Sequence, residues 1–328
     1  MAAADQNVAA EGMHVFRAMN TTVATAGLGP RDRARAEAWF ADAERRLSRF
    51  RPDSELADLN RTAGTGAAVL PSPLLRQALW EAHRCHLETA GVFNPFLGGT
   101  LAAYGYDESF ERLTAREAAT PFRPSPQTAN GRERPVLQAL AAVTLPDGPL
   151  TLPPDAAVDL GGIAKGWCAA ELAARLRGEG VTTGAVDVGG DIALWGAPPG
   201  GWEIGVADPY DEEADVATIW LRGSAGVATS TETKRAWRDA DGRELHHLLD
   251  PATMAPARSD LVQATVIAPD ATAAEVYAKC LLILGAETGI PWLKRLRPEC
   301  AYIAVGRDKQ LYVDPALTGG GDRHVTLA

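Results

Sequence analysis

The sequence predicts an α+β fold in which mixed or antiparallel sheets are flanked by helices. Helical periodicity dominates the first hundred residues, whereas short apolar runs dominate the second half. Several of these runs follow one another without an intervening helix, and parallel strands need such a crossover. The expected strands are 185–194, 203–207, 216–221, 226–230, 262–268, 301–305 and 310–313.

Three helices are expected before residue 91 and two after residue 164. The second starts as a short helix or turn at Ser54, and the third starts at Pro73 and stops before Gly91. The two later helices are expected at about 165–177 and 272–284. The first helix, from about residue 31, carries one apolar stripe at steps of four and three: Ala36, Phe40, Ala43, Leu47 and Phe50.

Composition and charge exclude several classes of protein. The chain has 328 residues, a formal net charge of −10, 46% hydrophobic and 23% charged residues, which is ordinary for a globular protein. Such an acidic chain does not suit nucleic acid as its main partner. We see no signal peptide and no apolar run long enough to span a bilayer, so we expect no membrane insertion. Cys85, Cys168, Cys280 and Cys300 form no C-x-x-C pair, which favours a cytoplasmic protein.

The sequence predicts one domain over residues 15–315. Residues 1–14 are expected to form a disordered N-terminal tail, and residues 316–328 a C-terminal tail. Residues 108–148 are rich in Pro, Thr, Arg and Gly with little periodicity, which is typical of a variable loop.

The densest motif is Val158-Asp-Leu-Gly-Gly-Ile-Ala-Lys-Gly166. A short apolar strand is expected to meet two glycines and then a helix with Cys168, Leu172 and Leu176 on one face. A helix start offers unpaired N–H groups and a positive dipole end to an anion, and Lys165 adds a cation there. The spacing matches neither a Rossmann motif nor a P-loop. A tight turn that needs glycine only for steric reasons is the alternative.

A second glycine cluster, Val186-Asp-Val-Gly-Gly-Asp-Ile192, lies on an expected strand. Glycine inside a strand indicates a bulge or a closely approaching neighbour. Asp187 and Asp191 are either ligands or, more commonly for such residues, acids that stabilise a turn.

Two pairs of histidines are candidates for a catalytic or metal-binding role. In His246-His-Leu-Leu-Asp-Pro251, a histidine before an Asp-Pro turn suits a general base at neutral pH, although a surface pair is the alternative. His83 and His86 on the third helix lack the i, i+4 spacing of a helical metal-binding pair.

Taken in sequence order, the motifs of this chain resemble those of the ApbE family of FAD:protein FMN transferases. Each motif is unspecific alone, but together they cover roughly residues 15 to 305 and are specific in combination. The matching stretches are Phe16-Arg-Ala-Met-Asn-Thr-Thr22, Leu47-Ser-Arg-Phe50, Ser54-Glu-Leu56, Leu59-Asn60, Gly91-Val-Phe-Asn-Pro95, Asp159-Leu-Gly-Gly-Ile-Ala-Lys-Gly166, Val188-Gly-Gly-Asp191, Ala228-Thr-Ser230, His247-Leu-Leu-Asp-Pro251, Val266-Ile-Ala-Pro269 and Leu281-Leu-Ile-Leu-Gly285.

The resemblance implies an ApbE-like fold with an elongated FAD cleft between two halves. Family members split the FAD diphosphate, attach FMN by a phosphoester to a Ser or Thr of a partner protein, and release AMP. The implied catalytic residues are His247, as the base for the incoming hydroxyl, and Lys165. The implied flavin-binding residues are Met19, Phe93, Asn94, Asp159, Gly161, Gly162, Lys165, Trp167, Thr229, Ser230 and His247.

The resemblance also implies a divalent metal, Mg²⁺, with ligands from two segments. One is a backbone carbonyl in the glycine-rich segment, here that of Ala164; the others are an Asp and a Thr on the late helix, here Glu275 and Lys279. An ammonium group only donates, so Lys279 cannot ligate a metal. The two side chains also suit an exposed helical ion pair, although apolar neighbours favour a cleft position. Two further departures are Asn94, where the family usually has Asp, and Met254, where it usually has Gly.

Three functions are compatible with these residues. The first is an active transferase with a modified metal site, which His247, Asp159 and Lys165 favour. The second is an FAD- or FMN-binding protein without transfer chemistry, which the altered late helix favours. The third is an FAD diphosphatase that yields FMN and AMP, because water can replace the acceptor hydroxyl.

Overall fold

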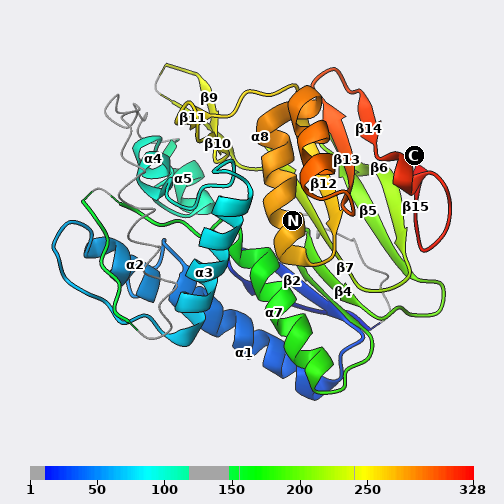
Figure 1. The fold of residues 1–328 in the computed structure, drawn as a ribbon, viewed down its shortest axis with the longest axis horizontal. Helices are drawn as coiled ribbons and strands as arrows, with labels where there is room; N and C mark the ends of the chain where they lie inside the picture. The colour runs from blue at the N-terminus through cyan, green and yellow to red at the C-terminus, as the bar shows by residue number, and fades with distance from the viewer. Residues whose placement is uncertain (1–11, 118–147, 155, 240) are drawn as a thin grey trace. The chain divides into compact units, whose positions relative to one another are not determined.

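The computed structural model describes residues 12–117, 148–154, 156–239 and 241–328 (Figure 1). The chain divides into two compact units, and each has its own hydrophobic cluster. Unit 1 comprises Met1–Ala41, Lys165–Thr231 and Ser259–Ala328. Unit 2 comprises Asp42–Ala164 and Glu232–Arg258.

Two antiparallel sheets form most of unit 1. The larger sheet has eight strands in the order β1-β2-β3-β4-β7-β12-β13-β14, and the smaller has three in the order β15-β6-β5. The strands of the larger sheet are β1 His14–Ala18, β2 Thr21–Ala26, β3 Gly184–Val188, β4 Asp191–Trp195, β7 Ala225–Thr231, β12 Leu261–Ala268, β13 Ala301–Gly306 and β14 Leu311–Val313. Those of the smaller sheet are β5 Trp202–Asp208, β6 Asp211–Leu221 and β15 Arg323–Leu327.

Alternate residues of the central strands face different partners, as the two-residue period of a strand requires. Val227 of β7 and Ile267 of β12 belong to one hydrophobic cluster, which also contains Ile204 and Ile219 of the smaller sheet. On β7 the neighbouring Gly226 faces the start of helix α8 (Ala271–Leu296), because a Cβ at this glycine would lie 2.1 Å from the Asp270 backbone. The larger sheet is thus covered by α8 on one face and by the smaller sheet on the other.

Helix α8 is the core helix of unit 1. It packs on β7 and β12, and its backbone breaks at Gly285, where φ is 76° and ψ is 176°. Within the described residues it is also the one helix long and apolar enough to cross a membrane, which corrects the expectation that the chain holds no such run. A buried core helix passes the same test, and 56% of its most apolar window is buried here.

Helices and small hairpins form unit 2. Its helices are α2 Glu55–Arg61, α3 Pro73–Glu88, α4 Gly98–Ala103 and α5 Phe110–Glu117, and its hairpins pair β8 Ala236–Arg238 with β9 Glu244–His246 and β10 Leu249–Asp250 with β11 Ala255–Pro256. Two longer helices cross the boundaries between the units: α1 (Pro30–Leu47) and α7 (Ala164–Gly178). Their predicted apolar stripes are buried, including Phe40 of α1 and Cys168 of α7. The exception is Phe50, which lies beyond the end of α1 and is half-buried.

The predicted α+β class is confirmed, but several elements differ from expectation. The run 185–194 is the hairpin β3–β4 rather than one strand, because Gly189 and Gly190 adopt positive φ. The expected strand before Gly161 is an irregular segment, and α4 and α5 were missed. Within the expected loop 108–148, residues 118–147 lie outside the described residues, as do residues 1–11 of the expected N-terminal tail. Residues 316–328, which are expected to form a C-terminal tail, contain strand β15, and this strand pairs with β6.

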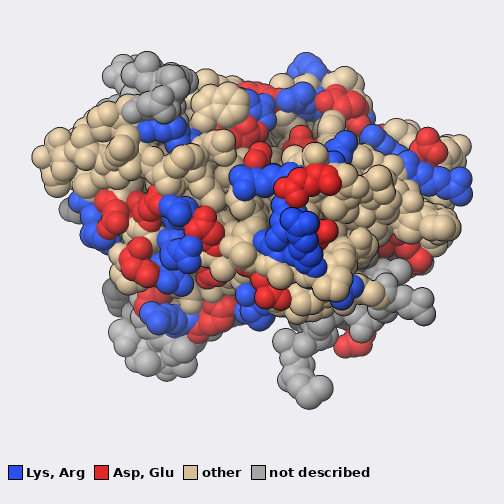
Figure 2. Space-filling view, turned by 90° about the horizontal axis from the view of Figure 1, so that it is seen from below, with Lys and Arg blue, Asp and Glu red and all other residues tan. Residues whose placement is uncertain are grey.

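Charged side chains of both signs are interspersed on the face that Figure 2 shows. Lys and Arg side chains lie next to Asp and Glu side chains over the described residues of this face. The net charge of −10 therefore does not gather there into one field of a single sign.

Candidate functional site

The predicted site residues fall into two groups, one in each unit. Unit 1 holds Met19, Lys165, Trp167, Thr229, Ser230, Glu275 and Lys279, and unit 2 holds Phe93, Asn94, Asp159, Gly161, Gly162, Ala164 and His247. Each group has its own geometry and its own polar contacts.

The centre of the unit 1 group is a buried cluster of one ammonium and two carboxylates. The Nζ atom of Lys165 contacts Oδ2 of Asp191 and lies 3.7 Å from Oε1 of Glu275. Side-chain exposure is 18% for the lysine and 2% for each carboxylate. The lysine lies in the first turn of α7, while Asp191 begins β4. The cluster thus joins segments far apart in the sequence.

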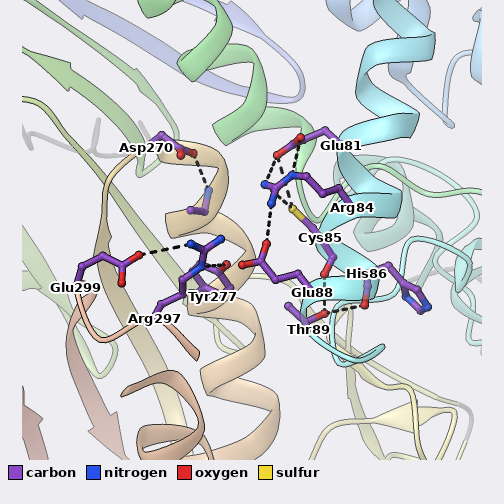
Figure 3. A network of polar contacts seen from close by, with 11 residues as sticks. Glu81, Arg84, Cys85, His86, Glu88, Thr89, Asp270, Tyr277, Arg297 and Glu299 are labelled. Carbon is purple, nitrogen blue, oxygen red and sulfur yellow. Dashed lines mark hydrogen bonds and ion pairs between the residues drawn. The ribbon is translucent and has the colours of Figure 1, made fainter. Parts of the chain in front are cut away.

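Glycine lets the starts of α7 and α8 approach closely. A Cβ at Gly166 would lie 2.4 Å from the carbonyl oxygen of Ala271, so a larger residue would force the helices apart. The Gly166 N–H donates to Oε2 of Glu275 at 2.8 Å. Asp270, which Figure 3 labels, fixes the α8 start because its side chain accepts from the Ala273 N–H.

The helix start of α7 differs from the anion site that the motif predicts. The Gly166 amide already donates to Glu275, and the Gly161 amide donates to Oδ1 of Asp159 at 2.8 Å. The Lys165 charge is opposed by two carboxylates. The two carboxylates fix the position of Lys165. The Gly161 and Gly166 amides, which the sequence predicts as donors to a phosphate, already donate within the protein.

The residues at the implied metal position offer an incomplete ligand set. Oε1 of Glu275 is buried and accepts no hydrogen bond from a described residue, and the cation that faces it is the Lys165 ammonium at 3.7 Å. Lys279, one turn later on α8, is half-buried and can only donate. Across the described ranges, no three His, Cys, Asp or Glu side chains gather as a metal site. These residues do not supply the three ligands that the resemblance implies for Mg²⁺.

Two tight turns lie side by side in unit 1. The β1–β2 turn places Met19 and Asn20 in the left-handed region, with φ of 52° and 58°, and the β3–β4 turn does the same with Gly189 and Gly190. A Cβ at Gly189 would lie 2.2 Å from Oγ1 of Thr21, so only a glycine at this position lets the two turns approach this closely. A methionine at positive φ is uncommon, and such strain concentrates at functional sites.

The remaining predicted residues of unit 1 have structural partners. Oγ1 of Thr229 lies 2.9 Å from Oγ1 of Thr265 across the β7–β12 pair. Ser230 is buried on the same strand. The Trp167 ring centroid lies 6.3 Å from that of Trp39, within the core. Their roles in flavin binding stay predictions.

The end of α3 holds the Phe93–Asn94 segment of unit 2. Thr89 donates to the carbonyl of Cys85 (Figure 3) and accepts from the Phe93 N–H. His86 Nδ1 lies 2.9 Å from the Phe93 carbonyl. Because a carbonyl only accepts, this nitrogen carries the proton. Burial lowers the His86 pKa, so the ring is neutral and structural.

Asp159 connects this segment to a buried arginine. Its N–H donates to the Pro95 carbonyl at 2.8 Å, and its Oδ2 lies 3.2 Å from Nε of Arg49. Asn94 turns its side-chain oxygen to the Phe96 N–H at 2.9 Å, which fixes the local turn. Sequence reasoning missed Arg49, although it lies inside the Leu47-Ser-Arg-Phe50 motif.

His247 lies beside an aromatic group in unit 2. Its ring centroid is 6.4 Å from that of Tyr106, which stacks on Trp237 at 5.5 Å. Burial is the main cause that raises the Tyr106 pKa. Met254 has a φ of 56°. Glycine adopts such a positive φ without strain, which explains why a glycine suits this position.

Solved structures share this α+β fold. The ApbE protein of Thermotoga maritima aligns with a TM-score of 0.73 and 22% identity, over 93% of this chain and 97% of that one. The flavinyl transferase ApbE of Pseudomonas stutzeri aligns with a TM-score of 0.68 and 23% identity, over 98% and 94%. The fold is therefore that of the ApbE proteins.

Sequence comparison assigns the family. A model of the ApbE family matches residues 18–304, and the chain belongs to this family. The FAD:protein FMN transferase of Treponema pallidum is 30% identical over 264 residues, which are 76% of this chain and 70% of the relative. That of Vibrio cholerae is 27% identical over 247 residues, 74% and 70% of the two chains.

Proposed function

We propose that this protein is an FAD:protein FMN transferase. The observation that carries the proposal is the family match over residues 18–304, a range that includes Lys165, Asp159 and His247. In the reaction, the oxygen of an acceptor hydroxyl attacks the FMN-side phosphorus of FAD. The bond from this phosphorus to the bridging oxygen breaks, AMP leaves with that oxygen, and FMN stays on the acceptor as a phosphoester.

His247 acts as the general base in this proposal. It takes the hydroxyl proton as the new P–O bond forms, which makes the acceptor oxygen a stronger nucleophile. Lys165 is the second catalytic residue of this proposal. Because two carboxylates oppose its charge, its contribution to the leaving phosphate is a hydrogen bond from a fixed ammonium rather than a net positive charge. The contacts with Asp191 and Glu275 provide that fixation.

The acceptor we propose is a Ser or Thr side chain of another protein. Among the described residues the metal position lacks a third ligand, so no step here depends on Mg²⁺. The cysteines are free thiols, which suits the reducing cytoplasm that the sequence predicts. Cytoplasmic location and the absence of membrane insertion remain proposals.

The test is AMP release from FAD by the full chain, with and without a protein acceptor. A transferase releases AMP in proportion to the acceptor modified. AMP with free FMN and an unmodified acceptor would instead show a diphosphatase. FAD binding without any AMP, with or without added Mg²⁺, would show a flavin-binding protein that has lost the chemistry.

A further inference from the structure

The side chain of Arg49 is buried against aromatic rings in unit 2. Its side-chain exposure is 9%. Its guanidinium carbon lies 4.0 Å from the ring centroid of Phe50 and 4.8 Å from that of Tyr106. Guanidinium groups stack on aromatic faces in this way, with their N–H groups directed outward in the guanidinium plane.

The hydrogen-bonding capacity of Arg49 is unused within the described residues. Nε lies 3.2 Å from Oδ2 of Asp159, but this contact is an ion pair without hydrogen-bond geometry. Nε and Nη2 are buried and make no hydrogen bond to the described part of the chain. A guanidinium has five N–H donors, and buried donors without acceptors are costly.

Charge and shape together define the acceptor that suits this arginine. Asp159 neutralises the guanidinium, so a second full anion such as a phosphate gains less there than a neutral acceptor does. The rings that stack on the guanidinium are those of Phe50, which is half-buried, and of Tyr106, which is buried. A planar ring with carbonyl oxygens fits both features. In FAD that ring is the isoalloxazine, because adenine carries no carbonyl group.

We propose that Arg49 is a specificity-determining residue that donates a hydrogen bond to a carbonyl oxygen of the flavin ring. The inference rests on the proposed function, because it takes FAD as the ligand. Asp159 is then a positioning residue, since it holds the guanidinium through Nε and leaves the other N–H groups for the ring. In this proposal Arg49 contacts the flavin ring and not the diphosphate.

The experiment compares three probes, riboflavin, FAD and ADP, with the full chain and an Arg49→Lys variant. Lysine keeps the charge beside Asp159 but loses the planar fork. Riboflavin and FAD affinities should fall by the same factor, about 10- to 100-fold, as for loss of a charge-assisted hydrogen bond. ADP affinity should stay within about two-fold. The control is Arg175→Lys, because Arg175 stacks on Trp39 at 4.0 Å in unit 1 and should leave all three affinities unchanged.

Unchanged riboflavin and FAD affinities in Arg49→Lys would overturn the inference. An equal loss of ADP affinity would also overturn it, since the arginine would then hold phosphate or the fold. If the variant does not fold, the parent protein is titrated with 2-thio- and 4-thioriboflavin. One of these should bind about ten-fold more weakly than riboflavin, because sulfur is the weaker acceptor; equal binding of all three would refute the proposal.

These outcomes separate the inference from the proposed function. A parent that binds riboflavin but releases no AMP refutes the transferase and leaves the Arg49 contact standing. A parent that transfers FMN while Arg49→Lys binds flavin normally refutes only the contact. A parent that binds no flavin refutes both.

Discussion

Replacing Lys165 with Met tests whether the buried cluster of unit 1 is a single electrostatic unit. The variant leaves Asp191 and Glu275, each 2% exposed, without their cation. At a separation near the 3.7 Å of the longer contact, the attraction is about 4 kcal/mol for an effective dielectric near 20. Removing one partner of a buried pair costs about 3–5 kcal/mol, and we expect a loss of this size in the free energy of unfolding.

The assay is equilibrium unfolding in urea, followed by tryptophan fluorescence. The matched control is Lys309→Met, because Lys309 is exposed with its Nζ 5.2 Å from the Tyr210 ring centroid. This control should lose no more than about 1 kcal/mol. Adding Asp191→Asn to Lys165→Met should recover part of the loss, since one buried carboxylate becomes neutral. A loss below about 1 kcal/mol for Lys165→Met, the range of exposed pairs, or no recovery in the double variant, would refute the reasoning.

Three further predictions concern the base, the metal position and pH. His247→Ala should lower turnover by about 10²–10⁴ while FAD affinity stays within a few-fold, measured by AMP release and flavin titration; unchanged turnover would assign the base elsewhere, with Asp250 the next candidate. Parent activity should depend only weakly on magnesium, and Glu275→Asp with Lys279→Thr should raise that dependence; a parent silenced by chelator and restored by magnesium would refute this. Burial lowers the His86 pKa below 6.5, so the unfolded chain binds the proton first, and stability should fall as pH drops below 6.5. His86→Gln should flatten that decline in urea titrations, and an equally steep decline would contradict it.

Helices with a continuous apolar stripe were predictable from the sequence. Ala36, Phe40, Ala43 and Leu47 of α1 are all buried, as their spacing requires. The burial of such a stripe can be predicted from the sequence, because side chains three and four residues apart share one face of a helix. The family motifs likewise located Lys165 at the start of α7.

Turns and contacts between distant segments were not predictable in the same way. The apolar run around Gly189 and Gly190 predicts a strand, yet positive φ at both glycines makes this segment a hairpin turn. Gly166 permits the close approach of Ala271, and this depends on a segment more than a hundred residues away. Arg49 gave no signal of its own, because its burial comes from Tyr106 and Asp159, which are remote in sequence.

The most direct measurement for the central claim is the intact mass of a protein acceptor after incubation with FAD and this enzyme. The acceptor is one that a relative modifies, paired with a variant in which its acceptor Ser or Thr is replaced by Ala. We predict that the acceptor gains the mass of one FMN less one water, that AMP appears in equal amount, and that the Ala variant gains nothing. An unmodified acceptor alongside bound or hydrolysed FAD, with or without added Mg²⁺, would contradict the account.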